Sequence, residues 1–193
     1  GLTQSDFNSV LDQIDHYYTP IIAAKGGHLY INRDWNSGTV NASANRSGST
    51  YTINMYGGLA RHPAINKDAF MLVACHEIGH HLGGAPKVAS WWGGDDWASN
   101  EGEADYFASL RCLRFMFNDA DNAAFVQAGG VDPALKTKCE QIYDSQPEEN
   151  LCMRIGMAGF VGATLFQTLH NNTAPLNFTT PDGSVVSRTD DDH

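Results

Sequence analysis

The segment His76-Glu77-Ile78-Gly79-His80 constrains this chain more than any other part of its sequence. Residues i and i+4 share one face of a helix, so His76 and His80 can present two imidazole nitrogens to a single ion. Glu77 lies about 100° around the helix from His76, so it can stay outside the coordination sphere and act as a general base. The segment therefore predicts a helix that carries a zinc site.

A second, acidic segment at residues 100–105 strengthens this prediction. The first motif alone would be weak evidence, because a chain with eight His and six Glu contains it by chance about once in a hundred cases. Glu101 follows His80 by 21 residues, a length that allows a second helix to cross the first. We expect Glu101 to be the third Zn²⁺ ligand, which leaves the fourth position open for water, as catalytic zinc requires. Asp105, one turn later on the same face, is expected to accept the outer N–H of a ligating His.

Together, His76-Glu77-x-x-His80 and Glu101-x-x-x-Asp105 resemble the gluzincin metallopeptidases, whose third zinc ligand is a glutamate on a second helix. The short gap is similar to that of thermolysin, and Glu-x-Glu-Ala-Asp resembles the HtpX-like and prenyl-protein peptidase family, here in a compact form without membrane spans. The resemblance covers residues 66–118. It implies a zincin-like α+β fold and a zinc-dependent endopeptidase acting on a protein or peptide substrate. It also implies that residues 50–56 bind the substrate backbone by edge pairing.

Three residues are candidates for stabilising the transition state, namely Tyr106, His170 and His193. HtpX-like peptidases often have a His-Pro turn followed by an Arg late in the catalytic domain. His193 has a suitable late position, but neither Pro nor Arg follows it. A terminal His is usually solvent-exposed, so we favour a tail residue at that position. The choice among the three stays open.

Length and charge exclude several other classes of function. A chain of 193 residues suits one catalytic domain over residues 1–193. The 12 Lys+Arg against 22 Asp+Glu give a net charge of −10, which argues against nucleic-acid binding. The longest nearly apolar stretch, residues 153–169, is too short and too Gly-rich for a membrane span. Gly1 begins the chain without a charged and apolar leader, so we expect a secreted or periplasmic protein whose signal peptide has been removed.

The four cysteines have no C-x-x-C spacing, which speaks against a cysteine zinc site. In an exported protein we expect at least one disulfide drawn from Cys112, Cys139 and Cys152. Cys75 points about 100° away from the neighbouring His76 on a helix, so we interpret it as a buried thiol or a half-cystine.

Hydrophobic periodicity predicts a small antiparallel sheet packed on the active-site helix, followed by a mainly helical C-terminal half. The active-site helix begins at Asn66, a good N-cap residue, and stops at Gly83-Gly84. The strands are expected near 29–35, 39–45 and 50–56. The other helices are expected at 6–18 (before Pro20), about 99–117, 121–128, 132–143 and 147–170.

Other prominent residues have simpler interpretations. We place His81 on the helix surface, and we expect Glu103 to be solvated or to contact a loop. Asp95-Asp96 is too small a group for a calcium site. Trp91, Trp92 and Trp97 are expected either to line a substrate cleft or to anchor their loop.

The alternative function is a catalytically idle zinc-binding domain that recognises a protein or peptide partner. Glu77 argues against it, because such a module needs the two His residues and no base between them.

Overall fold

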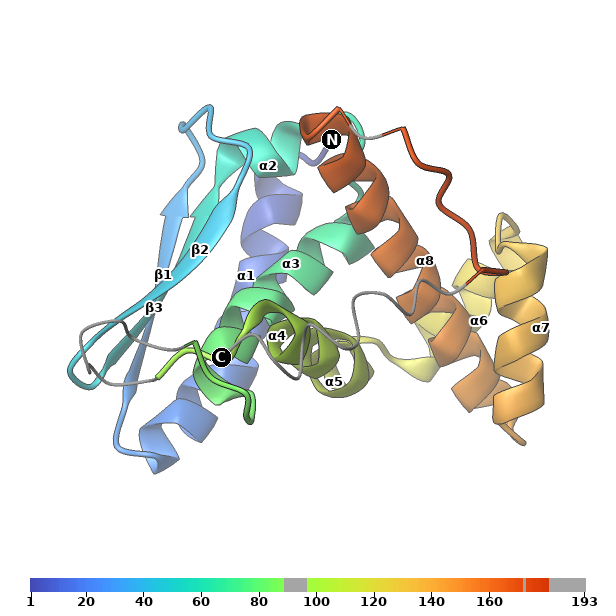
Figure 1. The fold of residues 1–193 in the computed structure, drawn as a ribbon. Coiled ribbons are helices and arrows are strands. Elements are labelled where there is room, and N and C mark those ends of the chain that lie inside the picture. The colour runs from blue at the N-terminus through green and yellow to red at the C-terminus, as the bar shows by residue number, and fades with distance from the viewer. Residues whose placement is uncertain (89–96, 172, 181–193) are drawn as a thin grey trace.

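The computed structural model describes residues 1–88, 97–171 and 173–180. It shows an α+β fold in which an N-terminal helix and a three-stranded sheet precede a mainly helical C-terminal half (Figure 1). In chain order the elements are α1 (Gln4–Ala24), β1 (His28–Asp34), β2 (Ala42–Ser47), β3 (Thr50–Tyr56), α2 (Gly57–Arg61), α3 (Lys67–Leu82), α4 (Glu101–Phe107), the π-helical η1 (Ala108–Cys112), α5 (Leu113–Met116), α6 (Asp119–Ala128), α7 (Pro133–Ile142) and α8 (Gln146–Leu169).

Helix α1 begins at a capping box and continues further than the sequence predicts. The side chain of Thr3 accepts a hydrogen bond from the backbone of Asp6, and the Asp6 carboxylate accepts one in return. The prediction that the helix ends before Pro20 is wrong, because α1 continues to Ala24. Proline removes one helical hydrogen bond, but the fully buried Ile22 anchors the last turn in the core.

The sheet is mixed, so the prediction of an antiparallel sheet is wrong. Its order is β1-β3-β2, with β1 parallel to β3 and β2 antiparallel to β3. Strand β3 has the predicted bounds and is the strand with alternate buried apolar residues, namely Tyr51, Ile53 and Met55. The central position gives these side chains neighbours on both sides, whereas the more polar β2 lies at an edge. Residues 35–41 therefore connect non-neighbouring strands instead of forming a tight hairpin.

Helix α3 lies against the sheet and starts and ends as predicted from its caps. The Asn66 side chain accepts a hydrogen bond from the Ala69 N–H, and the helix ends at the C-cap Gly83. Most of its residues are buried, because α1, β2, β3, α4 and α8 all contact it. A partly buried ion pair joins its first turn to α8, where the Arg154 guanidinium donates to both oxygens of Asp68 at 2.8 Å. The helix that carries the motif is therefore held firmly along its length.

The C-terminal half is helical as predicted, with one local difference. The predicted helix at 99–117 is divided into α4, η1 and α5, which follow one another without a break. A small second core lies between α7 and α8, and its buried members are Leu135, Cys139 and Met153. The larger core lies between α1, the sheet, α3 and the inner face of α8. In the described part of the chain no helix is long and apolar enough to cross a membrane.

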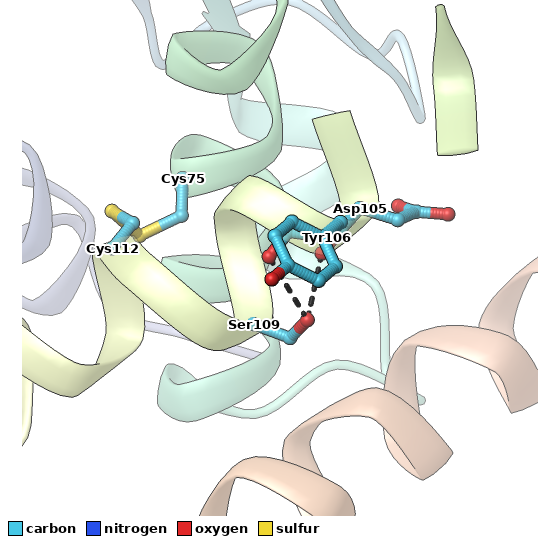
Figure 2. Close-up of a disulfide and its surroundings, with 5 residues drawn as sticks. All are labelled: Cys75, Asp105, Tyr106, Ser109 and Cys112. Atoms are coloured by element: carbon cyan, nitrogen blue, oxygen red, sulfur yellow. Dashed lines mark hydrogen bonds between the residues drawn. A yellow bond between two sulfur atoms is a disulfide. The ribbon is translucent and has the colours of Figure 1, made fainter. Parts of the chain in front are cut away.

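Two disulfides are present, Cys75–Cys112 and Cys139–Cys152. The expectation of at least one bridge among the three later cysteines is confirmed by the second, and Cys75 is a half-cystine. The first bridge links α3 to η1 (Figure 2). Two disulfides are consistent with an extracellular or otherwise oxidising compartment.

Candidate metal centre

Helix α3 presents His76 and His80 one turn apart, with their ring centroids 4.7 Å from each other and their planes nearly perpendicular. Glu101, the first residue of α4, brings its carboxylate to both rings. Its Oε2 lies 3.1 Å from the His76 Nε2, and its Oε1 lies 3.7 Å from the His80 Nε2. The candidate ligand atoms of the three residues all lie within 4.8 Å of one another. Tetrahedral zinc with bonds of about 2.0–2.1 Å separates its ligands by about 3.3 Å, so the group fits such an ion after small side-chain adjustments.

The outer nitrogens of both imidazoles have acceptors, which fixes their tautomers. The His76 Nδ1–H donates to the Asp105 Oδ1 at 2.8 Å, and the His80 Nδ1–H donates to the Ser99 carbonyl oxygen at 2.8 Å. A carbonyl oxygen can only accept, so His80 must carry its proton on Nδ1. Both Nε2 atoms then face Glu101, and each can offer its lone pair to a metal ion once it carries no proton. Outer hydrogen bonds of this kind are typical of metal-ligating histidines.

Sequence reasoning placed Asp105 beside His76 but did not find the acceptor for His80. The Ser99 carbonyl is a backbone group, so no residue type signals it. Ser99 is fully buried, and its N–H also donates to the His80 carbonyl at 2.9 Å. This reciprocal pair of bonds holds the chain just before α4 against the end of α3.

Further contacts fix α4 against α3. The Glu103 Oε1 accepts the Gly84 N–H at 2.7 Å, so the prediction of a loop contact for Glu103 is confirmed. Cys75–Cys112 also joins α3 covalently to η1, which continues α4 without a break (Figure 2). In η1, the Ser109 hydroxyl donates to the carbonyl of Asp105 at 2.8 Å, a side-chain bond to the backbone where the helix widens (Figure 2).

The electrostatics of this group favour a cation. Burial opposes protonation of His76, yet hydrogen bonds to Asp105 and Glu101 raise its pKa to about 10. The hydrogen bond from His76 in turn lowers the pKa of Glu101. Burial raises the pKa of Glu77 to about 7, with His76 opposing the shift and Glu101 adding to it. A positive charge placed among these carboxylates would be stabilised, and it would also keep Glu77 ionised.

A cleft of about 550 Å³ contains the group. Its lining includes all the candidate ligands, Glu77, Asp105, the segment 40–44 and the apolar side chains of Leu59, Val73 and Phe166. Glu77 is 5% exposed and reaches the cleft without belonging to the three-residue ligand group. Segment 40–44 was not singled out from the sequence, nor was Phe166. Both reach the cleft through the packing of distant elements.

The prediction that residues 50–56 offer a free edge to a substrate is wrong. This strand is β3, and β1 and β2 occupy its two edges. Within the described residues, β2 pairs on one side only, and it is the strand that borders the cleft. Strand β3, which has the strongest β pattern, lies at the centre of the sheet. The strand edge next to the cleft therefore belongs to its more polar neighbour, β2.

The prediction that His81 lies on the helix surface is also wrong. His81 is 6% exposed, stacks on Trp97 at 4.8 Å between ring centroids and donates through Nε2 to the Thr52 carbonyl at 3.0 Å. Burial lowers its pKa to about 4, so the ring is neutral at neutral pH. His81 thus connects α3 to the central strand. Trp97 both anchors this contact and lines the cleft.

The two candidates for transition-state stabilisation that lie within the described residues do not line the cleft. Tyr106 is 52% exposed, and His170 donates through Nδ1 to the Phe166 carbonyl at the end of α8. Neither belongs to the described lining of the cleft. His193, Asp95-Asp96, Trp91 and Trp92 lie outside the described residues.

Comparison with protein-family models, with curated proteins and with solved structures finds no match. The function must therefore be inferred from the site itself.

Proposed function

We propose that the chain is a zinc-dependent endopeptidase of the gluzincin type with a zincin-like fold. The observation that carries the proposal is the orientation of His76 and His80. Each ring donates a hydrogen bond from its Nδ1–H to a fixed acceptor, and the Nε2 of each ring faces the carboxylate of Glu101. With a metal ion in place of the Nε2 protons, two imidazoles and one carboxylate match the ligand set of a hydrolytic zinc site with one open position.

In this proposal His76, His80 and Glu101 would hold Zn²⁺, which would lower the pKa of a water near the scissile bond and polarise the carbonyl to be attacked. Glu77 is the general base. Its carboxylate accepts a proton from the attacking water and then delivers it to the leaving amine. Glu77 suits this role because it faces the cleft beside the candidate ligands, almost fully buried, without being part of their group. A buried carboxylate keeps its position and is poorly screened by solvent.

A peptide substrate is supported by the position of β2. An extended peptide can form main-chain hydrogen bonds with an unpaired strand edge, which brings its backbone past the metal ligands. Within the described residues β2 has such an edge, and it borders the cleft. We therefore assign to β2 the role that the sequence predicted for residues 50–56. A secreted or periplasmic location agrees with the two disulfides.

The test is digestion of a peptide library by the protein loaded with one equivalent of zinc. We expect cleavage that a chelator abolishes and that added zinc restores. Stoichiometric zinc binding with no cleavage of any peptide would instead support the catalytically idle zinc-binding domain. Failure to bind zinc at all would contradict both functions.

A further inference from the structure

The two helices that carry the candidate ligands touch at two small residues in matching positions. Gly79 stands three residues after the first candidate ligand of α3 and one before the second. Ala104, which is fully buried, stands three residues after Glu101 and one before Asp105. A close backbone contact of the two helices therefore lies between the two pairs of functional side chains.

The contact leaves no room for a side chain at position 79. A Cβ atom on Gly79 would lie 2.8 Å from the Ala104 carbonyl oxygen and 2.9 Å from the Ala104 Cα. Ordinary contacts begin at 3.4 Å, so the two backbones would have to separate by about 0.6 Å, the difference between 3.4 and 2.8, to reach ordinary contact. The atoms in the way belong to the backbone, which cannot rotate aside as the end of a long side chain can.

A movement of this size matters for a metal site. Ligand distances are typically kept within about 0.2 Å of their ideal values, which is well below the required shift. Two links also hold the helices together near this contact, the Cys75–Cys112 bridge and the hydrogen bond that the Gly84 N–H donates to Glu103. These links hold α4 near α3, and the residue at position 79 sets how closely the two backbones can approach.

We propose that Gly79 is a positioning residue for the metal centre. Its missing side chain lets α4 come close enough for Glu101 to join the two histidines and for Asp105 to reach His76. The inference rests on the proposed zinc site and adds to it the element that sets the ligand geometry. Glycine is unfavourable in the middle of a helix, so the sequence accepts a weaker α3 at this point.

The experiment compares Gly79→Ala with Gly159→Ala, a glycine of α8 where an added Cβ meets nothing within 4 Å. Both substitutions favour the helix, so thermal melts of the metal-free proteins report on folding. Zinc affinity is measured by competition with a chelator. We expect Gly79→Ala to fold and to bind zinc about 10- to 100-fold more weakly, the range typical of losing groups that orient a ligand. Gly159→Ala should bind zinc like the wild type.

A second comparison separates positioning from a general structural effect. In a Glu101→Ala/Asp105→Ala background the remaining ligands both lie on α3, so adding Gly79→Ala should cost no further affinity. A loss as large as in the wild-type background would overturn the proposal. Ala104→Ser enlarges the fully buried residue that Gly79 contacts by one atom, and it is the milder variant to use if Gly79→Ala does not fold.

Two further outcomes are distinguishable. Wild-type protein that binds zinc while Gly79→Ala binds it equally well would refute the role of Gly79 and leave the proposed function intact. Wild-type protein that does not bind zinc would remove the proposed function, and the role of Gly79 with it.

Discussion

The two disulfides hold two regions of the molecule that are built on different principles. The first region, the crossing of α3 with α4 and η1, is closed by Cys75–Cys112 inside the larger core, where both cysteines are fully buried. The second region, the pair α7 and α8, is closed by Cys139–Cys152 beside a small core with few buried side chains. In the first region backbone contact and directed hydrogen bonds fix polar groups in place. In the second, a covalent bond supports a modest apolar contact.

The polar groups with a precise arrangement lie in the first of these two regions. The crossing region holds the two histidines, their hydrogen-bond acceptors and the Glu101 carboxylate in a defined arrangement. The α7–α8 region contains no comparable cluster of metal-binding side chains among the described residues. We infer that changes in the first region alter metal binding and activity, whereas changes in the second alter only stability.

The largest difference between the regions is expected for their glutamates. Glu77→Gln in α3 should lower peptidase activity by about 10²–10⁴-fold, because it removes the general base. Zinc affinity should be nearly unchanged, since Glu77 is not a candidate ligand. The matched control is Glu140→Gln in α7, which should leave the activity at the wild-type level. Steady-state cleavage of a peptide by zinc-loaded protein measures both. Wild-type turnover by Glu77→Gln would eliminate it as the base.

Removing either disulfide should lower the free energy of unfolding, but only one of the two removals should also lower zinc affinity. The bridges span 37 and 13 residues, so loop-closure entropy predicts losses of about 4 kcal/mol for Cys75→Ala/Cys112→Ala and about 3 kcal/mol for Cys139→Ala/Cys152→Ala in the free energy of unfolding. Denaturant titration of the metal-free proteins measures these losses. Zinc affinity should fall only in the first variant, because only that bridge holds α4 near α3. Equal losses of affinity in both variants would contradict the comparison.

Zinc itself should protect one region more than the other. At a free zinc concentration of 100 times the dissociation constant, binding stabilises the folded state by about 2.7 kcal/mol. Amide hydrogen exchange should slow most in α3 and α4, which carry the candidate ligands, and least in α7. Exchange followed by mass spectrometry, with and without chelator, gives this map. Protection centred on α7 would place the metal elsewhere.

The smallest of these effects is expected for Asp105. Asp105→Ala should weaken zinc binding by about 10- to 100-fold, because His76 loses the acceptor that orients its ring. Asp105→Asn should do less harm, since an amide oxygen still accepts the hydrogen bond. Glu103→Ala is no neutral control here, because that carboxylate anchors Gly84. Asp119→Ala in α6 is the better control and should bind zinc like the wild type. A larger loss for Asp119→Ala would refute the assignment of Asp105.

Much of the candidate site could be predicted because its signals are local. His76 and His80 share a helix face whenever that segment is helical, and the N-cap residues Asn66 and Asn100 mark the starts of α3 and α4. The capping hydrogen bonds involve residues only three positions apart, so the sequence carries them directly.

The pairing of strands in the sheet is a feature that local sequence patterns do not determine. Strand β3 has the predicted bounds, and its antiparallel pairing with β2 agrees with the prediction. Its parallel pairing with β1 was not predicted, and the strand edge that faces the cleft was therefore predicted wrongly. Alternation of apolar residues identifies a strand but does not state which strand lies beside it. The same holds for His81, whose burial depends on Trp97 and on the central strand.

By itself, the sequence determined the α+β class, the helix that carries His76 and His80, the identity of the candidate ligands and the presence of half-cystines in the C-terminal half. Each follows from residue types at short, regular spacings. Only the tertiary structure decided the order of the strands, the pairing of Cys75 with Cys112, the Ser99 carbonyl as the partner of His80 and the contact of Gly79 with Ala104. These features depend on backbone groups and on segments far apart in the chain, which meet only when the whole core packs.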